Sequence, residues 1–184
     1  MPGPPAARCI APLTRAAQSG MADVLLCAPE ATAVAALDAR LSGTASLRVD
    51  NFAADDLTAA LSGMGDLTLT SGAPAAHARL QLSGSGKLVA AARRADVTLT
   101  GMGDVYVTAA EAVSGSIGGM GNVRYSPASA ACSVNGFGMG GCAAGEAPPP
   151  RLRCSDHGGK ELDAGNAQGF VVDVSGSQCQ VHTP

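Results

Sequence analysis

Two cysteine–histidine pairs have the only spacing in the chain that is typical of a metal site. Two residues separate Cys154 from His157, and two separate Cys179 from His182. Two thiolates and two imidazoles can form a tetrahedral zinc site. A disulfide between Cys154 and Cys179 would use the same sulfur atoms and require less order, and two free thiols are the third alternative. The spacing leaves these alternatives open, and we predict no metal ligand and no cofactor.

Aspartates recur in glycine-rich phrases, which raises the question of calcium. Asp23, Asp66 and Asp104 each lie three residues after a glycine. Glycine–aspartate repeats of β-rolls bind calcium between coils. In this chain, however, Lys87 occupies the equivalent position between Asp66 and Asp104. A cation then stands where a metal needs oxygen ligands, so we predict a solvated row of mixed charge.

Catalysis on sugars would need carboxylates that converge on one bond. The closest candidate is the pair Asp55 and Asp56, and neighbouring strand residues point to opposite faces. The chain has no Trp and only two Tyr to stack on sugar rings. His77 stands alone in a predicted surface turn. We therefore predict no catalytic residue and no enzyme, with a polysaccharide-binding or polysaccharide-cleaving β-helix as the alternative function.

The elements that would position these residues are short repeats. The phrase Leu61–Leu69 (LSGMGDLTL) returns as Leu99–Val107 (LTGMGDVYV) and in looser copies. A unit this short cannot bury its own apolar face, so its copies must stack into a shared core. We call the first glycine of each phrase its anchor glycine. The predicted structural anchors, spaced by 17 to 23 residues, are Gly20, Gly43, Gly63, Gly84, Gly101, Gly119 and Gly136.

Around each anchor the apolar residues alternate with polar ones. Aliphatic side chains stand two residues before six of the seven anchors and four residues after six of them, as Leu61 and Leu67 do around Gly63. Alternation of this kind predicts short strands with one buried face. The glycines predict a turn with positive φ and with close approach between neighbouring coils. The fold class is therefore all-β: a single-stranded parallel β-helix, or solenoid, of about seven short coils with a C-terminal appendage.

Composition shifts divide the chain. We predict a flexible lead-in over 1–18, the β-helix over 19–143, a proline-rich linker over 144–150 and a cysteine-containing tail over 151–184. The tail could add a strand to an open end of the rod. Cys132 and Cys142 fall on inward positions of the last coil, where they are either core residues or a disulfide.

The charge and hydropathy of the chain limit the classes of partner and the compartments that it can have. A formal net charge of −3 without a basic cluster excludes nucleic acid. No stretch approaches the ~20 apolar residues of a transmembrane segment. The first residues lack the apolar core of a signal peptide, so the residues alone do not give the compartment.

The phrase Ser-Gly-x-Gly-Asp-Val/Leu, set between short alternating strands, resembles the GIN domain family of auto-transporter adhesin heads. The resemblance covers 19–143 and is closest over 61–125, where Ser114–Tyr125 is similar to that family's closing coil. It implies a right-handed parallel β-helix and an extracellular or cell-surface location, and it supplies no catalytic residues. We therefore expect a non-catalytic adhesion or scaffold protein. Its partner would be a glycan or a cell-surface protein, and its open ends could self-associate.

Overall fold

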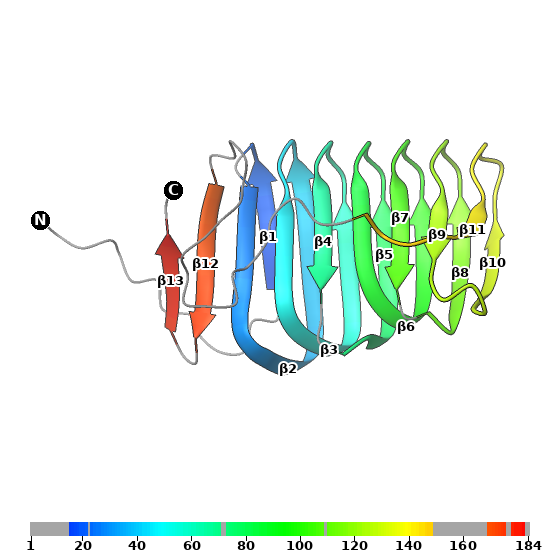
Figure 1. Ribbon diagram of the computed structural model, residues 1–184. Helices are drawn as coiled ribbons and strands as arrows, with labels where there is room; N and C mark the ends of the chain where they lie inside the picture. The colour runs from blue at the N-terminus through cyan, green and yellow to red at the C-terminus, as the bar shows by residue number, and fades with distance from the viewer. Residues whose placement is uncertain are drawn as a thin grey trace, which may run out of the picture.

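A computed structural model describes residues 15–21, 23–70, 73–108, 110–148, 169–175 and 178–182. The regular structure of these residues is entirely β-strand. Parallel strands stack into a β-solenoid of about six turns, which forms an elongated rod (Figure 1). The predicted fold class is confirmed.

Each complete turn contains a segment that follows one glycine phrase and a segment that precedes the next glycine phrase. In some turns these segments are two separate strands, and in others they are the two halves of one long strand that bends. β1 (Arg15–Gly20) and β11 (Cys142–Ala144) form half-turns at the two ends. The complete turns are β2 (Asp23–Gly43), β3 (Leu47–Leu61), β4 (Asp66–Thr70) with β5 (Ala75–Leu82), β6 (Lys87–Leu99), β7 (Asp104–Thr108) with β8 (Ala112–Ile117), and β9 (Val123–Tyr125) with β10 (Ala131–Asn135).

The number of coils is six rather than the predicted seven. Seven glycine phrases are present, but they form the corners between turns, and seven corners enclose only six complete turns.

Two faces of parallel strands enclose the core. The post-turn face contains the strands that follow the glycines, with Leu47, Leu67 and Leu88 in register. The pre-turn face contains the strands that precede them, with Leu61, Leu82 and Leu99 in register. The inward side chains of both faces are almost fully buried, as the alternation predicted. The interior is filled by Leu, Val and Ala, which a thin solenoid can accommodate.

The glycines are required by close approach between turns. At the corners, the amides of Met64, Ser85 and Met102 donate to the carbonyl oxygens of the anchor glycines one turn below, at 2.8, 3.0 and 3.0 Å. A Cβ atom on Gly101 would overlap the carbonyl oxygen of Gly84. The expectation of positive φ is wrong for these anchors, since among the described glycines only Gly115 has it, at 141°.

The last glycine phrase is displaced by two residues from the position we assigned to it. Gly136 lies beside Ile117, whereas Gly138 lies beside Gly119. Cys142 pairs with Val123, which makes Gly138, Met139 and Gly140 the stacked copy of 119–121. Gly136 then occupies the place that carries Leu or Ile in the other turns, so this coil lacks one core side chain.

A disulfide links Cys132 to Cys142 and so joins β10 to β11. Of the two alternatives left open by the sequence, the structure has the disulfide. It closes the coil whose core is thinnest.

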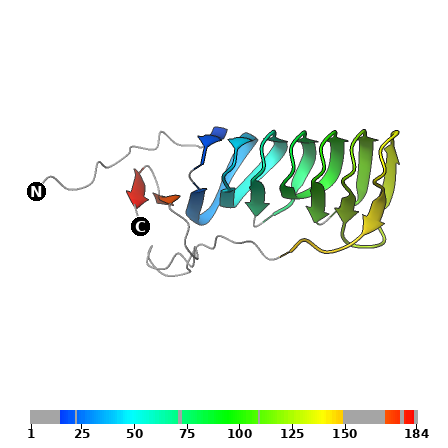
Figure 2. The ribbon, with the colours of Figure 1, turned by 90° about the horizontal axis from the view of Figure 1, so that it is seen from above.

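The tail returns to the opposite end of the rod. β12 (Gly169–Ser175) pairs in parallel with the start of β2, and β13 (Gln178–His182) pairs antiparallel with β12 (Figure 2). Cys154 and His157 lie outside the described residues, as do the side chains of Cys179 and His182, so the zinc, disulfide and thiol alternatives stay open.

Candidate binding surface

The glycine corners form one edge of the rod, which we call the turn edge. A shallow groove of ≈ 500 Å³ runs along it. The groove crosses four successive corners, and Asp66, Lys87 and Asp104 lie in three of them, at the first positions of β4, β6 and β7. The rest of its lining consists of small or flexible residues, namely Thr44, Ala45, Ser46, Met64, Gly65, Ser85, Gly86, Met102 and Gly103.

Asp and Asn side chains in the row of Asp66, Lys87, Asp104 and Asn122 link successive turns. Asp104 Oδ1 accepts hydrogen bonds from the Asn122 amide at 2.9 Å and from its Nδ2 at 3.3 Å. Asp66 Oδ1 accepts from the Lys87 amide at 3.2 Å, and Asn122 Oδ1 accepts from the Gly141 amide at 3.4 Å. The Asp or Asn of the repeated phrase therefore satisfies a backbone donor of the next turn where its strand begins.

The register of β4, β6 and β7 places a lysine between the two aspartates that could bind calcium. Lys87 pairs with Asp66 on one side and Asp104 on the other, so the three side chains form one row. Within the described part of the chain, no three His, Cys, Asp or Glu residues are grouped to hold a metal ion. The lack of a calcium effect stays a prediction.

The opposite edge, where the chain bends between the two faces, carries exposed charges. Asp55 and Asp56 are both exposed, because they lie at the junction between the part of β3 that pairs with β4, which ends at Asp50, and the part that pairs with β5, which begins at Asp56, so the expectation of opposite faces is wrong. His77 belongs to β5 and not to a turn, although it is exposed as expected. It pairs with Asp56 and Arg94. These residues are separated from the groove by the width of the rod.

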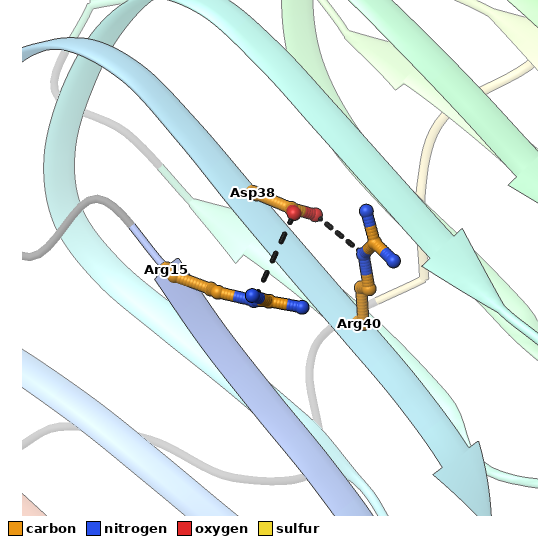
Figure 3. Close-up of polar contacts among 3 residues, drawn as sticks. All are labelled: Arg15, Asp38 and Arg40. Carbon is orange, nitrogen blue, oxygen red and sulfur yellow. Dashed lines mark hydrogen bonds and ion pairs between the residues drawn. The ribbon is translucent and has the colours of Figure 1, made fainter.

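Ion pairs lie on the outer sides of both faces. Arg48 and Asp50 form a buried two-point pair on the post-turn face, with Nε–Oδ1 and Nη2–Oδ2 distances of 2.8 and 2.7 Å. On the pre-turn face, Asp38 lies between Arg15 and Arg40 (Figure 3), at 3.9 and 2.9 Å. The hydrogen bond from Arg40 to Asp38, supported by Coulomb attraction, raises the pKa of the Arg40 guanidinium. All three ion pairs join residues on one side of the sheet and suit a structural role.

Exposed methionines on the turn edge are a feature that our sequence reasoning missed. Met64 and Met102 line the groove, and Met120 and Met139 continue the row in the next turns. Their exposed fractions range from 54% for Met120 to 84% for Met139. The signal was present in the sequence, since each of these methionines directly follows the first glycine of a phrase.

None of the described residues forms a helix long and apolar enough to cross a membrane. No curated protein and no solved structure matches the chain. Residues 26–127 match the model of the family described as "Putative auto-transporter adhesin, head GIN domain". This segment spans the described turns from β2 to β9 and so includes the groove. The chain belongs to the GIN domain family of auto-transporter adhesin heads.

Proposed function

We propose that this chain is a non-catalytic adhesion or scaffold module displayed at the cell surface, with the groove of the turn edge as its contact surface. The observation that carries the proposal is the family match over 26–127. A glycan or a cell-surface protein would be the partner.

The chemistry of the groove supports recognition of a polar, extended ligand. Thr44 and Ser85 provide hydroxyl groups, and Lys87 provides a cation between two carboxylates. Because the backbone of the groove repeats from turn to turn, it presents side chains at the strand spacing of about 4.8 Å. Such a surface suits a polymer with many hydroxyl groups better than a compact apolar ligand.

Polysaccharide cleavage is the second candidate, and the two carboxylates of the groove favour it. Asp66 and Asp104 lie two turns apart, which is about 9.6 Å at the usual strand spacing and close to the separation of carboxylates in inverting glycosidases. Against it, each carboxylate already accepts a hydrogen bond from the next turn. Lys87 also occupies the space between them.

Location and binding can be tested separately. Intact cells that make the native precursor should allow this chain to be labelled by a membrane-impermeant biotin reagent; labelling only after lysis would contradict surface display. Purified chain should bind a panel of acidic and neutral glycans or host-cell surfaces without turnover. Turnover that disappears in Asp66→Asn or Asp104→Asn would replace the adhesion proposal with the enzymatic one.

A matched pair of variants tests the groove itself. Lys87→Ala removes the cation of the groove, whereas Arg79→Ala removes an exposed cation from the pre-turn face. We expect weaker binding in Lys87→Ala and unchanged binding in Arg79→Ala. Equal binding by both variants and the unchanged chain would move the contact surface away from the turn edge.

A further inference from the structure

Apart from Met1, all methionines of this chain occupy the same position of the repeat. Five of the six methionines directly follow the first glycine of a phrase, and the sixth is Met1. No buried core side chain of the described turns is a methionine, although this residue readily fills apolar cores. All five are exposed: Met21, Met64, Met102, Met120 and Met139.

Three of them occupy consecutive turns, and we call these three the thioether row. The amide of Met120 donates to Gly101 at 3.1 Å, and the amide of Met139 donates to Gly119 at 3.0 Å. These bonds stack Met102, Met120 and Met139 at the strand spacing of about 4.8 Å. In contrast, Met64 is flanked by Thr44 and Ser85 in the turns on either side.

We propose that the thioether row binds a soft monovalent cation of the Cu(I) or Ag(I) type. Thioether sulfur is a soft, uncharged donor that selects Cu(I) over the hard divalent ions. Each methionine side chain has three rotatable bonds, so sulfur atoms from neighbouring turns can converge on one ion. The glycine corners hold the backbone in place, because the anchors pack against one another without room for a Cβ atom.

Charged side chains lie beside the first turn of the row. Asp104 lies two residues after Met102, at the first turn of the row, and its carboxylate lowers the energy of a nearby cation. Lys87 pairs with Asp66 on one side and with Asp104 on the other, so it lies one turn from Met64 and one turn from Met102, and its charge repels a cation beside either of them. Met120 and Met139 lie two and three turns from Lys87, and within the described turn edge methionines occupy consecutive turns only over 102–139.

Silver titration of the full chain tests the proposal. Ag(I) shares the ligand preference of Cu(I) and needs no reductant, so the Cys132–Cys142 disulfide stays intact. Free thiols are alkylated beforehand, and the buffer contains nitrate in place of chloride. We expect saturable binding of about one Ag(I) per chain, with shifts in the ε-methyl NMR signals of Met102, Met120 and Met139 but not of Met21 or Met64.

Leucine variants separate metal binding from apolar contact. Met120→Leu keeps the size and apolar character of the side chain but removes the central sulfur, and it should weaken binding by about tenfold or more. Met64→Leu is the matched control and should bind Ag(I) as the unchanged chain does. The proposal is overturned by the absence of saturable binding, by equal effects of the two variants, or by similar shifts of all five methyl signals.

Discussion

The two edges of the solenoid are constrained in different ways. At the turn edge, backbone atoms of successive turns are in contact, and five successive corners repeat the same hydrogen bond to an anchor glycine of the turn below. At the opposite edge, where the chain bends between the two faces and which we call the bend edge, the chain accommodates all the variation in repeat length. The anchors are 17 to 23 residues apart, yet the strands on both sides of each corner stay in register.

The edges also differ in the residues they expose. The bend edge carries exposed charged side chains such as Asp56 and Arg94. Water solvates these charges, so they do not need a fixed position. The turn edge carries glycine at fixed positions, Met or a small hydroxyl residue between the glycines, and a row of charges that includes Asp66, Lys87 and Asp104. A surface whose geometry repeats without variation can present a periodic array of contacts, and this is why we place the proposed contact surface and the thioether row on the turn edge.

Insertions should distinguish the two edges most strongly. A Gly-Ser insertion after Met102 would move every later residue out of register with the turn below, so we expect loss of cooperative unfolding or at least about 3 kcal/mol of stability. The same insertion after Arg93, at the bend, should cost less than about 1 kcal/mol. Urea denaturation of the two variants measures the difference. Equal losses would mean that the bend edge is as constrained as the turn edge.

Glycine substitutions refine the comparison within the turn edge. A Cβ atom at Gly101 would collide with the backbone of Gly84, and backbone cannot move aside as a flexible side chain can. Gly101→Ala should therefore lose about 3 kcal/mol, and Gly101→Val at least as much.

Gly118→Ala provides the control for this substitution. The nearest atom to a Cβ at Gly118 is Thr100 Cγ2 at 3.8 Å, an ordinary contact. Its stability should change by no more than about 0.5 kcal/mol. An unchanged denaturation midpoint for Gly101→Ala would show that the turns separate easily, against the close packing described above.

The sequence predicted the fold because both of its signals are local. Glycine every 17 to 23 residues and alternation on either side follow directly from stacking, so the core was foreseeable down to Leu61 and Leu67. Gly136 was assigned as an anchor from the preceding Val134-Asn135, but the pairing of Cys142 with Val123 sets the register two residues later. The match of Gly138-Met139-Gly140 to other phrases could have shown this.

The candidate site was harder to foresee than the fold. The groove depends on which side chains several turns bring together, and one repeat does not contain that information. The exposure of Asp55 and Asp56 depends on where β3 bends, which alternation alone does not fix. The choice between a disulfide and core packing for Cys132 and Cys142 likewise required the distance between β10 and β11.

Removing a side chain from the row of Asp66, Lys87, Asp104 and Asn122 should have a smaller effect on stability. Asp104→Ala removes the acceptor of two hydrogen bonds from Asn122, so we expect a loss of about 1 kcal/mol. Asp104→Asn retains an oxygen acceptor and should lose less. Asp96→Ala, on the exposed outer side of the pre-turn face, is the control and should change stability by less than about 0.5 kcal/mol. The melting temperatures of the variants, measured by thermal unfolding, test this prediction. Equal decreases for Asp104→Ala and Asp96→Ala would mean that the Asp104 side chain does not stabilise the stacking of the turns.

Calcium should have the smallest effect of all. A cation that binds only the folded chain raises its melting temperature by mass action, so the melting temperature reports a calcium site without knowledge of its ligands. In the turn-edge row, Asp66 and Asp104 each bond to the next turn, and Lys87 lies between them. We therefore expect the same melting temperature in millimolar calcium and in a chelator. A melting temperature that rises by several degrees with calcium would instead show that the turn edge binds calcium as β-rolls do. In that case Lys87→Asp, which places a third carboxylate between Asp66 and Asp104, should increase the rise in melting temperature.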